Sequence, residues 1–119
     1  MPADRLHVLL LIGDSRDLRR VRALLDEAFA LGSIRISAAV GAMDALASVA
    51  DDETGVLITT RGPDEIAELL VQAPGLTVLA LSDSAAPVAA GAQEALVLSD
   101  LDGSRLGRAV RHAVERSRK

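Results

Sequence analysis

The sequence contains no cysteine, no tryptophan and no tyrosine, and its only aromatic residue is Phe29. Without cysteine the chain has no disulfide, no thiolate nucleophile and no cysteine zinc site, and an intracellular origin is the simpler expectation. Only two histidines are present, too few for a histidine metal cage. The scarcity of aromatic residues disfavours base stacking and aromatic interface anchors. The core must therefore be built from Leu, Val, Ile and Ala.

Long hydrophobic runs and an excess of positive charge are also missing. The longest apolar stretch, residues 8–12, is much shorter than the roughly 20 residues that span a bilayer. Gly13 ends it without the cleavage pattern of a signal peptide, so we expect a cytoplasmic protein with no membrane partner. A formal net charge of −4 argues against nucleic-acid binding by this domain. At this length we expect residues 1–119 to form one globular domain.

Five strand patterns alternate with five helix patterns along the chain. Continuous apolar runs are typical of central strands covered on both faces, and a segment that alternates apolar and polar residues suits an edge strand. The alternating segment is 33–40, with Val40 on its inward side. The expected strands are residues 7–12, 33–40, 56–60, 76–81 and 95–98.

Apolar residues at helical spacing define the segments between these strands. Ser15 is expected to cap the first helix and Gly32 to close it. The second helix begins near Ala42, and the last one is capped by Asp102 or Ser104. The expected buried positions of the second helix are Met43, Leu46, Val49 and Ala50.

Consecutive βα units joined by short loops favour a parallel sheet with right-handed crossovers. The sequence therefore predicts an α/β fold, a flavodoxin-like doubly wound sheet of five parallel strands with helices on both faces. The expected strand order is 2-1-3-4-5, with the alternating second strand at the edge. In such folds the working site lies beyond the carboxyl ends of the strands.

Two phrases resemble a known family. Residues 9–20 (LLLIGDSRDLRR) look like the opening of a bacterial response-regulator receiver domain, and residues 91–102 (GAQEALVLSDLD) look like its last loop and last strand. The resemblance covers the whole chain, with third and fourth helices shorter than is typical. It implies phosphorylation of a strand-3 aspartate, supported by Mg²⁺ on an acidic pair, a Ser/Thr after strand 4 and a Lys after strand 5.

The chemical positions of that family are largely replaced. Ser82 holds the Ser/Thr position, but the family's acidic pair falls on Gly13 and Asp14, so one carboxylate survives. A single carboxylate is a poor cage for Mg²⁺, and Asp14 is at most a weak metal position. The other departures from the family pattern are Thr60, or Thr59, at the phosphoacceptor, Leu98 at the lysine and Ala95 at the aromatic switch position.

The resemblance therefore implies a pseudo-receiver that has kept the fold without the chemistry: no enzyme, no cofactor, and a function in signalling through protein partners. Two alternatives stay open. A substitute acid, Asp83 or Asp100, would make it an atypical phosphoacceptor, and the strand-end crevice would suit a small-ligand sensor. Each remaining site residue also has a structural interpretation, with Asp14 as a helix cap, Ser82 as a turn residue, and Thr59 and Thr60 as strand residues.

The fourth helix region, the fifth strand and the final helix form the expected interaction face. The segment 84–90 is short and contains proline, so apolar surface beside it is expected to stay exposed and to bind a partner or a second copy as a homodimer. Receiver domains commonly pair through this region, and Asp100 and Asp102 would set the register of a symmetric contact. The expected interface residues are Val88, Leu96, Leu101, Arg105, Arg108 and Arg111.

Overall fold

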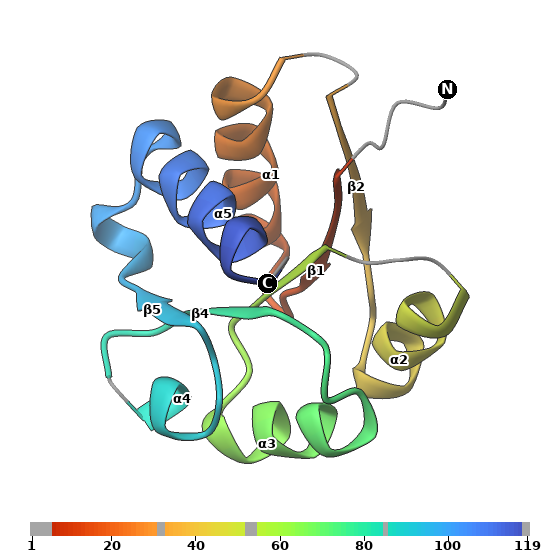
Figure 1. Ribbon diagram of the computed structural model, residues 1–119. Helices are drawn as coiled ribbons and strands as arrows, with labels where there is room; N and C mark the ends of the chain where they lie inside the picture. Colours follow the sequence, from red (N-terminus) through yellow and green to blue (C-terminus); the bar gives the residue numbers. More distant parts are fainter. Residues whose placement is uncertain (1–5, 31–32, 52–54, 85, 118–119) are drawn as a thin grey trace.

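Strands and helices alternate along the entire fold (Figure 1). The computed structural model describes residues 6–30, 33–51, 55–84 and 86–117. The strands are β1 (Leu6–Leu11), β2 (Ile34–Ala38), β3 (Val56–Thr59), β4 (Val78–Leu81) and β5 (Glu94–Leu96). The helices are α1 (Ser15–Ala28), α2 (Ala42–Asp51), α3 (Pro63–Gln72), α4 (Ala86–Ala89), a 3₁₀ turn η1 (Leu98–Asp100) and α5 (Gly103–Ser117).

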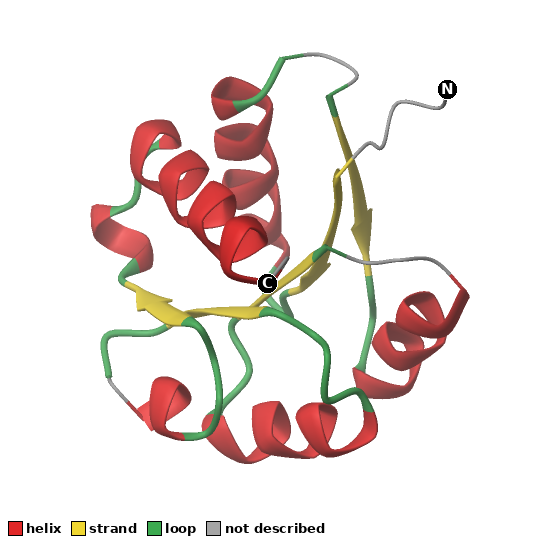
Figure 2. Cartoon of the chain, in the orientation of Figure 1, coloured by secondary structure: helices red, strands yellow, loops and turns green. Residues whose placement is uncertain are grey.

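All strand pairs are parallel, and the strand order is β2-β1-β3-β4-β5. Helices α1 and α5 cover one face of the sheet, and α2, α3 and α4 cover the other (Figure 2). The predicted flavodoxin-like fold and its strand order are therefore confirmed. None of the helices in the described part of the chain has the length and hydrophobicity needed for a bilayer crossing.

The continuous apolar run of β1 serves two cores at once because successive side chains of a strand point to opposite faces. Val8 and Leu10 pack against α1 and α5, while Leu9 and Leu11 pack against α2 and α3. All four side chains are fully buried. This double burial makes β1 the centre of the fold and fixes the position of the loop that follows it.

Small residues let α5 approach α1 closely. Gly103 and Gly107 lie one turn apart, and a Cβ added at Gly107 would stand 3.0 Å from the Cβ of Ala28. Arg111 completes the contact, because its guanidinium donates to the carbonyl of Ala28 at 3.0 Å and lies 4.8 Å from the centre of the Phe29 ring. The α1–α5 pair is thus a tightly joined layer.

Several local predictions are wrong, and each has a physical reason. Val40 is 87% exposed because β2 ends at Ala38 and the Val40 amide turns to donate to the Asp44 carboxylate at 2.9 Å. Met43 is 83% exposed because α2 buries Ala45 instead. The predicted helix end at Gly32 lies outside the described residues, as do the side chains of Val49 and Ala50.

The fourth and fifth units are the least regular. Helix α4 is a single turn of four residues, and the chain leaves it through Gly91, whose φ of +117° favours glycine. Strand β5 has three residues and ends at Leu96, so Leu98 lies in η1 and not in the strand. Asp102 caps α5, as expected, by accepting from the Arg105 amide at 2.8 Å.

Candidate functional site

The carboxyl ends of the parallel strands meet at one edge of the sheet, where doubly wound folds place their sites. The β1–α1 turn contributes Gly13 and Asp14, the end of β3 contributes Thr59 and Thr60, and Ser82 follows β4. The sequence-predicted strand ends are thus at the same edge of the sheet. What these side chains can do depends on the bonds that they already make.

Asp14 is occupied as the N-cap of α1. Its Oδ1 accepts from the amides of Arg16 at 2.8 Å and Asp17 at 3.0 Å. The hydrogen bond from the Asp17 amide and then that from the Arg16 amide hold the pKa of this exposed carboxyl below its ordinary value. The structural interpretation of Asp14 is confirmed, and the prediction that Ser15 is the cap is wrong because Ser15 is already the first helical residue.

Thr59 is fully buried, and its hydroxyl forms hydrogen bonds with backbone groups. The Oγ1 donates to the carbonyl of Leu11 at 2.8 Å and accepts from the amide of Arg61 at 2.9 Å. The first bond ties β3 to β1, and the second shapes the turn into α3. Thr60 is half-buried just beyond the strand, where its amide donates to Leu11 at 3.3 Å. Neither threonine presents a carboxylate.

Ser82 is a turn residue, as the structural interpretation predicted. Its hydroxyl oxygen accepts from the Ser84 amide at 3.1 Å, and the hydroxyl of Ser84 accepts in turn from the Ala86 amide at 3.0 Å. These two local bonds lead the chain into the short helix α4.

The last two predicted positions point to opposite cores. Leu98 is half-buried against the α1–α5 core, and Ala95 packs against the core on the α3 side. The small side chain of Ala95 leaves a surface hollow of about 400 Å³ beside it. This hollow is lined by Ser82, Asp83, Ser84, Val88, Gln93, Glu94, Ala95 and Val97.

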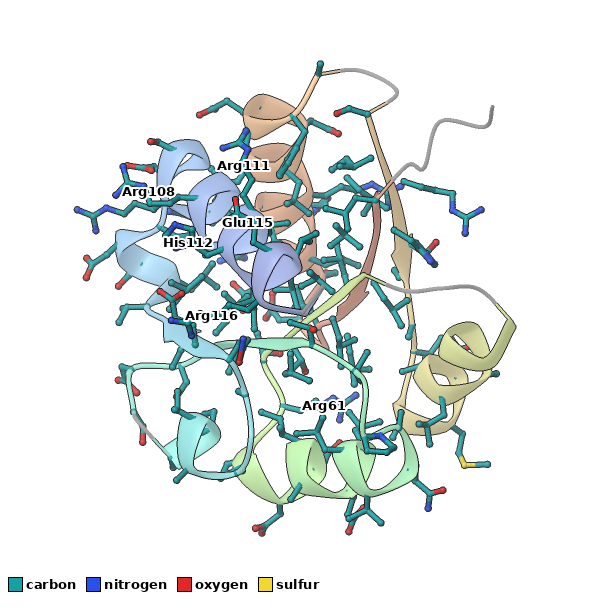
Figure 3. The ribbon with its side chains drawn as sticks, viewed as in Figure 1. Arg61, Arg108, Arg111, His112, Glu115 and Arg116 are labelled. Atoms are coloured by element: carbon teal, nitrogen blue, oxygen red, sulfur yellow. The ribbon has the colours of Figure 1, made fainter. Side chains whose placement is uncertain are left out.

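The sequence places Arg61 at this edge, directly after Thr60, but predicts no role for it. Figure 3 shows it in the space between the sheet and α3. The guanidinium lies 3.4 Å from the Val40 carbonyl and 3.7 Å from the Glu65 carboxylate, while its Nε is buried with no partner. Arg61 thus joins the β2–α2 turn to α3. Its place one residue beyond the acceptor position was the signal that could have found it.

The arrangement offers few ligands for a metal. Within residues 6–30, 33–51, 55–84 and 86–117, His, Asp and Glu side chains form no group of three that could hold a cation. Mg²⁺ is usually bound through one or two carboxylates together with waters and phosphate oxygens. Asp14 is the one acid of the family's pair, and its Oδ1 is already shared by two amides.

The fold matches solved structures, although no protein-family model and no curated protein matches the sequence. The signal receiver domain of an HD domain-containing protein from Pseudomonas fluorescens has a TM-score of 0.76 at 23% identity, over 96% of this chain and 98% of that chain. A LuxR family DNA-binding response regulator from Silicibacter pomeroyi gives 0.77 at 24%, over 92% and 91% of the two chains. Chemotaxis protein CheY4 from Vibrio cholerae gives 0.73 at 18%, over 92% and 98%. The chain has the fold of a receiver domain.

On this receiver fold, the predicted interaction face is only partly as expected. The prediction that Leu101 lies on the surface is wrong, because its side chain is 5% exposed and packs into the core on the α1–α5 side of the sheet. Arg111 is turned toward α1 and bonded there. Val88 is 44% exposed, and Leu96 is half-buried beside the edge of the sheet. Arg105 and Arg108 are exposed on the side of α5 that faces β5.

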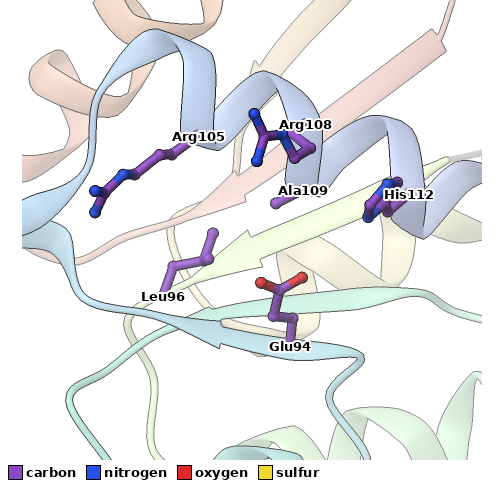
Figure 4. A pocket seen from close by; sticks show the side chains of 6 residues that line it. All are labelled: Glu94, Leu96, Arg105, Arg108, Ala109 and His112. Atoms are coloured by element: carbon purple, nitrogen blue, oxygen red, sulfur yellow. The ribbon is translucent and has the colours of Figure 1, made fainter.

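A second hollow separates β5 from α5 in the receiver fold (Figure 4). Its volume is about 260 Å³. Leu96 and Ala109 supply apolar surface, and the charged groups around them come from both elements. The polar lining residues are Glu94, Arg105, Arg108 and His112.

Proposed function

We propose that this chain is a pseudo-receiver, a signalling domain of a bacterial two-component-type regulator that works by binding protein and is neither phosphorylated nor an enzyme. The observation that carries the proposal is the state of the strand-end hydroxyl. Thr59 uses its hydroxyl once as donor and once as acceptor inside the fold, so this hydroxyl is not free to act as a nucleophile.

The neighbouring positions support the same proposal. A receiver needs a carboxylate that both ligates Mg²⁺ and attacks phosphorus, and Thr60 supplies only an alcohol. Leu98 cannot replace the lysine that would hold a phosphoryl oxygen, and the chain's one lysine is Lys119. Arg61 is held at Val40 and Glu65, on the side of β3 away from Ser82.

The surface available for binding is the one formed by α4, β5 and α5. Strand β5 is an edge strand of three residues, and α4 covers little of it because α4 is one turn long. Val88 and Val97 are exposed there at 44% and 38%. Exposed apolar residues beside an open strand edge are typical of an interaction surface. The partner is another protein or a second copy of the chain.

Amide NMR tests the proposal. We expect Mg²⁺, alone and with acetyl phosphate, to produce no saturable shifts at Gly13, Asp14 or Thr60. The matched control is Asp14→Asn, which keeps the cap but removes the charge. Saturable wild-type shifts that this variant abolishes would overturn the proposal and establish a working metal site. Shifts centred on Asp83 or Asp100 would favour a substitute phosphoacceptor.

A further inference from the structure

Helices α5 and α3 carry equal and opposite charge on opposite faces of the sheet. Helix α5 contains four arginines and one glutamate, a net charge of +3, whereas α3 contains three acids and no base, a net charge of −3. The two helices cover different cores, so they do not neutralise each other inside one copy, although Glu65 of α3 pairs with Arg61 at 3.7 Å (Figure 1). The chain therefore presents two complementary surfaces that it cannot bring together itself.

The surface on the α5 side is the hollow between β5 and α5. Figure 4 shows Arg105, Arg108 and His112 along one wall, Glu94 on the other, and Leu96 with Ala109 between them. Among the described residues Arg108 makes no ion pair with a carboxylate, in contrast to Arg61, which pairs with Glu65. The guanidinium of Arg108 is thus available to an acid of another molecule, while that of Arg105 also donates to the Asp100 carbonyl at 3.3 Å.

The surface on the α3 side is a row of exposed side chains along one side of this helix. Asp64, Glu68 and Val71 are spaced four and three residues apart, which places them on one side of the helix. All three are exposed, and Val71 is 79% exposed. Val71 lies one turn beyond Glu68, so the row carries two acids followed by one exposed apolar side chain.

We propose that α3 of a second copy binds in the hollow between β5 and α5, head to tail. Val71 of one copy enters the apolar part of the hollow, against Leu96 and Ala109, and Glu68 lies against Arg108. Glu94 on the opposite wall repels the acids of α3 and so keeps them on the α5 side. The inference rests on the proposed function, since it names the partner of the same protein-binding surface.

A symmetric contact through the same face has less support. Asp102 would have to meet an arginine of the partner, yet its Oδ1 already caps α5. Leu101 is buried, and Arg111 is bonded to α1. Asp100 is exposed and stays available to an arginine of a partner, but α3 offers three acids on a single helix. Because a head-to-tail contact leaves one hollow and one α3 free, it extends into chains unless the rotation closes a ring.

Sedimentation velocity over a wide concentration range tests this inference. We expect wild type to form species larger than a dimer as its concentration rises, and high salt to dissociate them. Arg108→Glu and Glu68→Arg should each weaken association by about tenfold or more, because each places like charges in contact. The double variant Arg108→Glu/Glu68→Arg should restore it. Val71→Ser should weaken it without any change of charge.

Arg22→Glu is the matched control, since it reverses an exposed arginine of α1 that neither lines the hollow nor belongs to α3. Circular dichroism confirms that each variant is folded. A monomeric wild type at every concentration would overturn the inference, as would a double variant that stays dissociated. Loss of association by Arg108→Glu with no effect of Glu68→Arg would show a symmetric contact instead. None of these results bears on phosphorylation, which the Mg²⁺ and acetyl phosphate experiment decides separately.

Discussion

Replacement of Thr59 by valine tests whether the strand-end hydroxyl is structural. Valine keeps the shape of the buried side chain but removes its donor and its acceptor. The Leu11 carbonyl retains the longer bond from the Thr60 amide at 3.3 Å, whereas the Arg61 amide loses the 2.9 Å bond to Oγ1. The substitution therefore breaks two hydrogen bonds and leaves one backbone donor without its partner.

The expected loss of unfolding free energy is about 2 kcal/mol, because each intramolecular hydrogen bond contributes roughly 0.5–1.5 kcal/mol net. The matched control is Thr60→Val one residue further on. Thr60 is half-buried, and its hydroxyl makes no hydrogen bond to any part of the chain that the structure describes. This control should change the unfolding free energy by no more than about 0.5 kcal/mol.

Urea unfolding followed by far-ultraviolet circular dichroism measures both values, since the chain has no tryptophan or tyrosine for fluorescence. The urea midpoint of Thr59→Val should fall by about 1 M or more relative to that of Thr60→Val. Equal midpoints for the two variants would refute this prediction, because they would show that the buried Thr59 hydroxyl does not stabilise the fold.

Three further outcomes follow from the local contacts. Asp14→Ala should lower the melting temperature at neutral pH, whereas Asp14→Asn should not. Because the pKa of Asp14 is depressed in the folded state, the stabilisation by the wild-type carboxylate should be lost as the pH falls below 3.8. A difference between wild type and Asp14→Ala that does not change with pH would contradict this. Gly91→Ala should lower the unfolding free energy by about 1–2 kcal/mol in urea titrations, since its φ of +117° strains an L-residue, and an unchanged midpoint would contradict that strain. Arg111→Ala should lower the unfolding free energy by about 1 kcal/mol in the same titration, because the bond to α1 and the contact with Phe29 are lost. Arg108→Ala should leave the unfolding free energy unchanged. Equal values for the two arginine variants would show that Arg111 does not join the helices.

The layers and the strand order could be predicted because the buried residues of a strand or helix recur in the sequence in a pattern typical of that element. Residues 8–12 are apolar without interruption, and the apolar stripe of α5 repeats at helical spacing, so both elements follow from sequence alone. The N-terminus of α1 was harder to predict from the sequence, because Asp14 and Ser15 are adjacent and both residue types are good N-caps. Only the backbone geometry shows that Asp14 has the extended conformation of a cap.

The failures concern residues whose environment is set by distant parts of the chain. Val40 fits the alternating pattern of β2, but its amide donates to the Asp44 carboxylate, and the backbone leaves the strand direction there. Leu101 looks like an exposed residue beside a short strand, yet it packs into the core on the α1–α5 side of the sheet. The role of Arg111 depended on the end of α1, more than 80 residues earlier in sequence. Such contacts have no period and leave no local pattern.

Intact mass spectrometry after incubation with acetyl phosphate and Mg²⁺ tests the central claim most directly. A phosphorylatable receiver domain in a parallel reaction shows that the donor is active. The mass of this chain should stay unchanged while the control gains one phosphoryl group. A stable adduct on this chain, mapped to Asp14, Asp83 or Asp100, would contradict it.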